Sequence, residues 1–286
     1  MKNTLSLFSF PKGINYKNEL LAGFTVAMTM IPESLSFAIL AGLSPLTGLY
    51  AAFMMGLVTA VLGGRPGMVS GGAGATIVVL IALIKTHGVE YLFATVVLGG
   101  ILQLMVGVFR WGKFVRLIPQ PVMYGFLNGL AVIIFMAQVE QFKIIRSDGV
   151  VSWLQGIPLY VMCSLTALTI SIVYFFPKIT KVVPASLVAI ILVFAVVSGL
   201  GISTKTVADI ASISGTLPTF HIPQIPFSLD TLQIIFPYAL IMAGVGLIES
   251  LLTLSMVDEI TNSKGNANKE SVAQGLANIT NGFFGG

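Results

Sequence analysis

The sequence predicts an all-α, polytopic membrane protein. Hydrophobic residues make up 56% of its 286 residues and charged residues only 9%, and the mean hydropathy is +0.95. A soluble domain carries about 25% charged residues, so the composition alone indicates a membrane protein. Apolar runs also follow one another closely, and a run of about 20 apolar residues is what an α-helix needs to cross a bilayer.

The apolar runs predict nine segments in chain order. They are Leu20–Ala41, Pro45–Leu62, a broken third segment ending near Ile84, Tyr91–Phe109, Leu117–Val139, Trp153–Phe176, Val183–Leu200, Leu232–Met256 and Val272–Phe284. The last segment is only weakly apolar because it contains the polar run ANITNG. The long polar interval Gly201–Asp230 contains FHIPQIPF, whose prolines argue against a helix there.

The distribution of basic residues predicts how these segments are oriented. If residues 1–19 form a cytoplasmic N-terminus and each segment crosses once, eleven Lys and Arg residues fall on the cytoplasmic side and four on the other. This bias follows the rule that short cytoplasmic loops are rich in Lys and Arg. We therefore expect residues 20–286 to form a transmembrane domain in the cell (inner) membrane, with the N-terminus on the cytoplasmic side.

The first segment contains an acidic residue directly after a proline. Pro32 removes a helix hydrogen bond, and Glu33 follows it midway along the segment. A carboxylate beside a bound anion repels it unless the carboxylate is protonated, so Glu33 is a candidate for coupling anion binding to proton uptake. A pore-facing or gating role without coupling is the alternative.

The third segment, Gly63–Leu83, is interrupted by glycine and proline. Its apolar part, Ile77–Ile84, is too short to cross a bilayer. Broken helices near the bilayer midplane are typical substrate sites, and the N-terminal end of a half-helix favours an anion. We therefore expect Ser70–Thr76 to be the mouth of a half-helix, although a close-packing seam between helices is also consistent with these small residues.

The eighth segment contains one ionisable residue in the interior of its apolar run. Sixteen uncharged residues, from Gln233 onward, precede Glu249. An ionisable residue within a membrane segment is a functional candidate by default, and Glu249 can carry a proton or ligate Na⁺. Thr253 lies four residues on and so shares its helical face. The alternative is a structural carboxylate bonded to a neighbouring backbone group.

Two short sequences suggest an internal repeat. Glu33-Ser34-Leu35-Ser36 in the first segment resembles Glu249-Ser250-Leu251-Leu252 in the eighth, and a Gly-Gly pair follows each about one segment later. Seven crossings separate the two copies, so they run in opposite directions and indicate an inverted repeat. Chance similarity is the alternative, because both motifs are short.

Three stretches resemble the SulP family of anion transporters, which includes sulfate permeases, bacterial bicarbonate transporters and dicarboxylate carriers. They are PESLSFAILAGLSPLTGLYAAF (Pro32–Phe53), VLGGRPGMVSGGAGAT (Val61–Thr76) and GLIESLLTLSMVDEITNSKGNANKESVAQGLANITNGFFGG (Gly246–Gly286). The resemblance implies a 7+7 inverted repeat with a core domain, a gate domain and facing half-helices in segments three and ten. The chain is then expected to be the first nine segments, ending before segment ten and without the STAS domain that often follows.

The resemblance also implies where the ligands bind. The predicted substrate-binding residues are Glu33, Phe37, Ser70, Ala73, Gly74 and Ala75. The family often has an aromatic residue at the Phe37 position, with ordinary packing as the alternative role, and many members have glutamine at the position of Glu33. The resemblance implies that Glu249 and Thr253 bind the coupling ion, Na⁺ or H⁺. No other metal, no cofactor and no catalytic residue is expected. Ala73 stands where the bicarbonate carriers have threonine, which argues against bicarbonate as the substrate.

The leading functional prediction is secondary active transport of sulfate, bicarbonate or a dicarboxylate, coupled to Na⁺ or H⁺, by an elevator-like movement. One alternative is a nucleobase–cation symporter of the same architecture, in which Glu249 contacts the substrate. Others are a passive anion channel and a truncated fragment that transports nothing. The expected partners are a small inorganic or carboxylate anion and the lipid bilayer, with a homodimer left open. Nucleic acid is excluded because the basic residues lie in short loops between apolar runs.

Overall fold

The computed structural model describes residues 15–286 apart from residue 73 and residues 113–119, 146–150, 181–182, 205, 207–214 and 216. It is predominantly helical, which confirms the predicted fold class. The chain forms two compact units: Glu33–Leu130 with Ile213–Gly286, and Gly13–Pro32 with Ala131–Ser212. The first boundary between them falls at Pro32–Glu33, inside the first helix.

The described helices occur where the sequence predicts segments. They are α1 Tyr16–Leu40, α2 Pro45–Leu62, α3 Gly74–His87, α4 Val89–Val108, α5 Gln120–Glu140, α6 Ile157–Ile179, α7 Ala185–Gly199, α9 Leu229–Thr261 and α10 Ala267–Phe283. Among the described residues, α1, α2, α4, α6 and α9 are long and apolar enough to cross a membrane. α1 begins four residues before the predicted Leu20 and continues as one helix through Pro32.

The third segment is broken, as its composition predicts. Residues 63–72 form a loop without helix, and α3 begins at Gly74 and has 14 residues. At 1.5 Å per residue this helix is about 21 Å long, well short of the ~30 Å hydrocarbon core of a bilayer. The loop is held by α9 and by the connection that follows it, because Arg65 forms a salt bridge with Asp258 (Nε to Oδ1, 3.3 Å) and donates to Ser263 Oγ at 2.8 Å.

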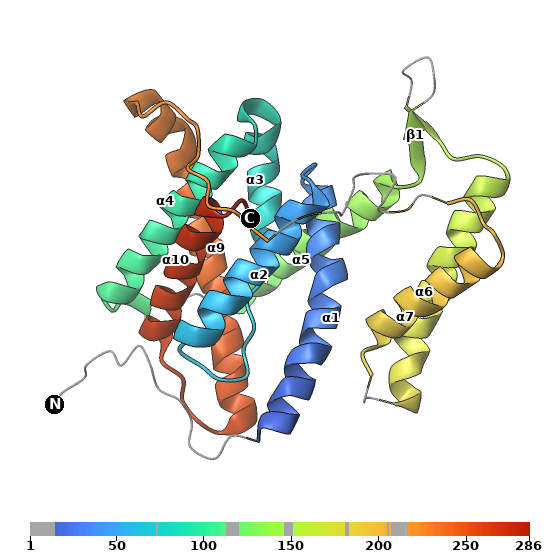
Figure 1. The fold of residues 1–286 in the computed structure, drawn as a ribbon, viewed down its shortest axis with the longest axis horizontal. Helices are drawn as coiled ribbons and strands as arrows, with labels where there is room; N and C mark the ends of the chain where they lie inside the picture. The colour runs from blue at the N-terminus through green and yellow to red at the C-terminus, as the bar shows by residue number, and fades with distance from the viewer. Residues whose placement is uncertain are drawn as a thin grey trace. The chain divides into compact units, whose positions relative to one another are not determined.

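The first unit is packed around α10, the segment that hydropathy predicts least well. Figure 1 shows α10 beside α4 and α9, and it also contacts α2. Glycines allow the close approach of α4, since a Cβ on Gly275 would lie 2.7 Å from the Gly100 carbonyl oxygen and one on Gly282 2.7 Å from that of Phe93. Polar residues on most of its faces are buried, which explains why α10 is not strongly apolar.

An extended segment crosses the ends of α4 and α10. The His221 N–H donates to the Phe283 carbonyl oxygen at 2.7 Å, and the His221 ring Nε2 lies 2.9 Å from Glu90 Oε2. The same carboxylate accepts from the Gln224 N–H at 2.7 Å. Residues 217–228 contain no helix, as the prolines of FHIPQIPF predict, and their contacts hold them against the first unit.

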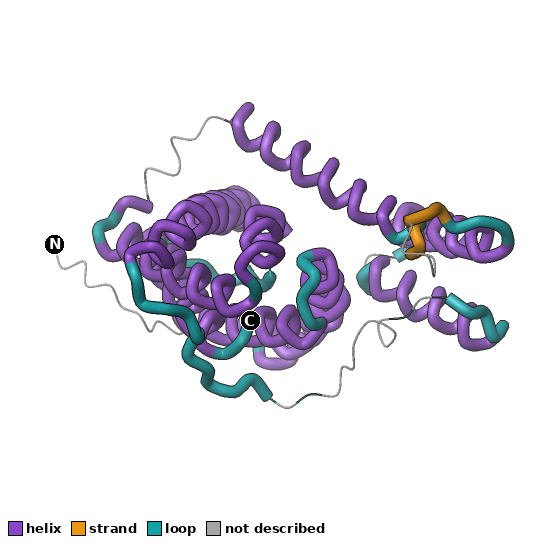
Figure 2. The backbone as a smooth tube through the Cα atoms, turned by 90° about the horizontal axis from the view of Figure 1, so that it is seen from above, coloured by secondary structure: helices purple, strands orange, loops and turns teal. Residues whose placement is uncertain are grey.

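The second unit contains α6 packed against α7 and a small hairpin that the sequence did not predict. Strands β1 Lys143–Ile145 and β2 Val151–Trp153 form the antiparallel hairpin drawn in orange in Figure 2. Lys143 pairs with Trp153 across the two strands. The Lys143 ammonium lies 5.2 Å from the centre of the Trp153 ring, a cation–π contact across the two strands. The prediction that segment six begins at Trp153 is therefore wrong, because pairing across the hairpin places that residue in a strand.

Candidate functional site

The start of α3 lies under an aromatic ring from α1. A Cβ built on Gly74, the first residue of α3, would lie 2.8 Å from Phe37 Cε1 and 2.9 Å from Cζ. The edge of the Phe37 ring therefore touches the backbone at this helix end, with no room for a side chain. The first N–H groups of an α-helix have no partner within the helix, and the dipole makes this end positive. Phe37 and Gly74, 37 residues apart in sequence, thus form one side of a place that favours an anion.

Two acidic residues of the first unit lie on α1 and α9. Glu33 precedes Phe37 by four residues and so shares its helical face. Glu249 lies on α9, which packs against α3. Both side chains are exposed.

Thr253 lies one turn along α9 from Glu249. Its hydroxyl donates to the Glu249 backbone carbonyl oxygen at 3.0 Å, so the hydroxyl proton is already used within the helix. The lone pairs of the hydroxyl oxygen remain, and they can accept a hydrogen bond or ligate a cation. The Glu249 carboxylate and the Thr253 oxygen can therefore contribute two oxygen ligands from one helix face.

Ser70 is bound by α10. Gln274 Nε2 donates a short hydrogen bond to Ser70 Oγ, and the same amide nitrogen donates to Glu270 Oε1 at 2.9 Å. Ser70 lies four residues before the first helical residue of α3. Its hydroxyl therefore fixes the approach to the helix as well as being a candidate contact for a ligand.

The structure brings Phe37 of α1 and Gly74 of α3 together, with Glu33 one turn from Phe37. Glu249 and Thr253 share one face of α9, which packs against α3. Ala73 lies outside the described residues, as does the side chain of Ala75. The substrate and coupling roles of all of these residues remain predictions.

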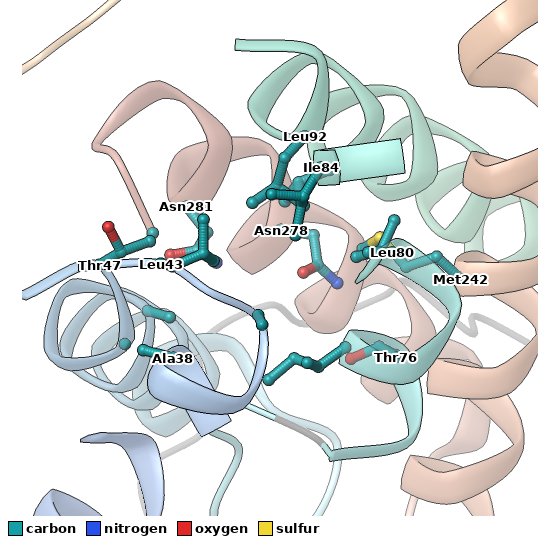
Figure 3. A pocket seen from close by; sticks show the side chains of 16 residues that line it. Ala38, Leu43, Thr47, Thr76, Leu80, Ile84, Leu92, Met242, Asn278 and Asn281 are labelled. Atoms are coloured by element: carbon teal, nitrogen blue, oxygen red, sulfur yellow. The ribbon is translucent and has the colours of Figure 1, made fainter. Parts of the chain in front are cut away.

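A cavity of about 90 Å³ lies beside α3 in the same unit. Thr76, Leu80 and Asn278 are among the residues around it (Figure 3). Most of its lining is aliphatic, including Ile77 and Val96. Burying an anion against such surfaces costs several kcal/mol without compensating donors, so this cavity is not the candidate anion site.

The sequence did not identify the polar residues of α10 as part of this region. Gln103 joins this region to α9, because its Oε1 accepts from Asn278 Nδ2 at 2.7 Å while its Nε2 donates to the Ala243 carbonyl oxygen at 3.4 Å. Glu270 and Gln274 were not singled out. The available signal was the spacing of Glu270, Gln274 and Asn278 at intervals of four, which places all three on one helical face.

The comparisons with known proteins agree on one family. A family model described as the sulfate permease family matches residues 16–286. The Bacillus subtilis (strain 168) protein YbaR, whose name gives it a conjectured role in sulfate transport, is 43% identical over 272 residues, covering 95% of this chain and 54% of YbaR. BicA of Picosynechococcus, named as a bicarbonate transporter, is 30% identical over 291 residues, covering 95% of this chain and 51% of BicA.

A solved structure agrees with the sequence matches. The transmembrane domain of a cyanobacterium bicarbonate transporter, BicA, matches with a TM-score of 0.82 and 30% sequence identity, covering 98% of this chain and 75% of that chain. The chain spans about half the length of the curated relatives it matches.

Proposed function

The chain belongs to the sulfate permease family, and from that premise we propose that it serves secondary active transport of a small anion across the cell membrane. The observation that supports this most is that the start of α3 lies against the Phe37 ring of α1, in a helix that also packs against α9. A helix N-terminus supplies backbone N–H donors and a positive end, which bind an anion without a basic side chain.

Sulfate is the first substrate to test. YbaR, the relative with 43% identity, carries a name that points to sulfate, whereas the BicA proteins are named for bicarbonate at 30% identity. A site built from backbone N–H groups selects by charge and size, so bicarbonate and dicarboxylates remain substrates of the same class. Ala73, in place of the threonine expected of bicarbonate carriers, favours sulfate over bicarbonate.

The membrane arrangement follows from the same proposal. The N-terminus lies in the cytoplasm, as the excess of Lys and Arg in alternate loops supports. The exposed apolar side chains of α6, such as Ile157 and Ile170, are suited to lipid contact. Transport proceeds by movement of one part of the protein relative to another.

The proposed activity is tested by uptake into liposomes that contain the purified full-length protein. Labelled sulfate, bicarbonate, fumarate, chloride and uracil are compared with Na⁺ and proton gradients varied separately. We expect gradient-dependent sulfate accumulation, inhibited by the other anions. Uracil uptake without anion uptake would instead identify a nucleobase symporter, and anion flux that never exceeds equilibrium would identify a passive channel.

Substitution of Glu249 by glutamine is expected to uncouple transport. The carboxylate is the group able to carry a proton or ligate Na⁺, and glutamine keeps its size without its charge. Gradient-driven sulfate accumulation should fall roughly tenfold or more, while sulfate–sulfate exchange continues. Glu259→Gln, at an exposed position near the end of the same helix, is the matched control. Gradient-driven accumulation at the wild-type level in Glu249→Gln would remove Glu249 from coupling.

Substitution of Glu33 by glutamine is expected to lower the KM for sulfate. A carboxylate near the start of α3 repels the anion, and glutamine keeps the size of the side chain without its charge. The KM for sulfate should therefore fall several-fold. Sulfate KM is measured with Glu19→Gln at the exposed start of α1 as control. The same KM in Glu33→Gln and wild type would exclude Glu33 from the anion site.

A further inference from the structure

One carboxylate is buried between α10, α9 and the loop before α3. Glu270, in the first turn of α10, is only 2% exposed. A buried charge is costly unless hydrogen bonds compensate it, so a carboxylate at this depth needs several donors. Its place in the first turn of α10 is favourable, because the helix dipole is positive there.

The donors to Glu270 come from three parts of the first unit. The Gly64 N–H of the α2–α3 loop donates to Oε2 at 2.8 Å. The Ser250 hydroxyl of α9 donates to Oε1 at 3.0 Å, and Gln274 Nε2 of α10 donates to the same oxygen at 2.9 Å. All three bonds run toward the carboxylate, so the ionised form satisfies every partner.

The same network reaches the start of α3. Gln274 Nε2 also donates to Ser70 Oγ, and the Asn266 N–H donates to the Gly64 carbonyl oxygen at 3.0 Å. The loop of residues 63–72 is thereby attached at Gly64, near its beginning, and at Ser70, near its end. Gly64 and Glu270 are 206 residues apart in sequence, so α10 fixes a loop that belongs to the other end of the chain.

We propose that Glu270 is a positioning residue for the anion site: through Gly64 and through Gln274 and Ser70 it holds the α2–α3 loop so that α3 begins under Phe37. Glu270 itself does not touch the anion. This role rests on the proposed function in one respect, namely that the anion binds at the start of α3. A role limited to joining α9 to α10 is the competing explanation.

Removal of every acceptor at position 270 separates these explanations. Glu270→Met keeps roughly the length of the side chain but offers no acceptor oxygen to the Gly64 N–H or to the Gln274 amide. The bond from Gly64 is therefore lost, and Gln274 no longer joins position 270 to Ser70. Glu270→Gln keeps the network, because its amide oxygen accepts from Gly64 and its amide nitrogen donates to the Gln274 oxygen once that amide turns over, an oxygen that also accepts from the Ser70 hydroxyl.

A thiol in the loop reports its position without requiring transport. Gly72→Cys places a side chain where no atom lies within 4 Å of the built Cβ, and Cys163→Ser removes the native thiol. The rate of maleimide labelling is then measured on purified protein. Lys264→Cys, exposed in the connection between α9 and α10, detects general opening of the unit.

We expect Glu270→Met to raise labelling of the Gly72→Cys thiol roughly tenfold, with the Lys264→Cys rate unchanged, and to raise the KM for sulfate more than it lowers kcat. Glu270→Gln should label close to the wild-type rate, and Glu259→Gln should leave the rate unchanged. An unaltered loop rate in Glu270→Met, or a rate in Glu270→Gln as high as in Glu270→Met, would overturn the proposal. Because labelling needs no substrate, the labelling rates test the positioning role even in a protein that transports no sulfate.

Discussion

Replacement of Gly275 by valine is expected to eliminate most of the folded protein. A Cβ at this position of α10 would lie 2.5 Å from the Leu104 backbone nitrogen and 2.7 Å from the Gly100 carbonyl oxygen. These are backbone atoms of α4, so relief requires that the two helices separate along their contact. Overpacking commonly lowers the free energy of unfolding by about 1–3 kcal/mol. We expect Gly275→Val to lower it by at least the upper value, because the clash is with backbone atoms and no side chain can rotate away.

The effect of Gly275→Val is measured by the yield of monodisperse protein and by the midpoint of thermal unfolding in detergent. Gly244→Val on α9 is the matched control, because nothing lies within 4 Å of a Cβ built there. We expect Gly244→Val to resemble wild type. Equal yield and equal thermal stability for the two variants would show that the close approach of α4 and α10 does not stabilise the fold.

Replacement of Gly74 by leucine is expected to abolish sulfate binding while the protein stays folded. The new side chain would overlap the Phe37 ring, whose nearest atoms are 2.8 and 2.9 Å from the built Cβ. The ring can swing away, so the cost to folding is smaller than at Gly275. The leucine then fills the space beside the first N–H groups of α3, and an anion cannot approach them.

Binding of labelled sulfate to purified protein measures this effect. We expect the affinity of Gly74→Leu to fall roughly tenfold or more, with a thermal midpoint close to that of wild type. Gly23→Leu, on α1 and likewise with no atom within 4 Å of a built Cβ, should retain binding. Wild-type affinity in Gly74→Leu would mean that residues 70–76 serve only helix packing.

The sequence predicted the helices and the break in α3 because both follow from local composition. The α2 bounds, Pro45–Leu62, agree at both ends because Pro45 and Gly63 mark the limits of its apolar run. α9 extends beyond the predicted Leu232–Met256 to Leu229–Thr261, since its polar first and last turns carry no hydropathy signal. Hydropathy measures lipid compatibility, and it therefore underestimates helices whose ends leave the apolar region.

The candidate site was predicted only in part. Glu33, Glu249 and Gly74 stand out because charge or glycine is unusual within apolar runs. Glu270 does not stand out, because α10 is polar over much of its length and reads as a weak segment. Its role depends on contacts with Gly64 and Ser250 that no local pattern encodes.

The central claim is that an anion binds at the start of α3 under Phe37. Selenate resembles sulfate, and its selenium gives an anomalous diffraction signal that locates it in a crystal. After competition with sulfate for binding is established in solution, we expect a selenium peak within hydrogen-bonding distance of the N–H groups at the start of α3 and beside the Phe37 ring. A peak elsewhere in a protein that binds selenate, with this place empty, would contradict the account.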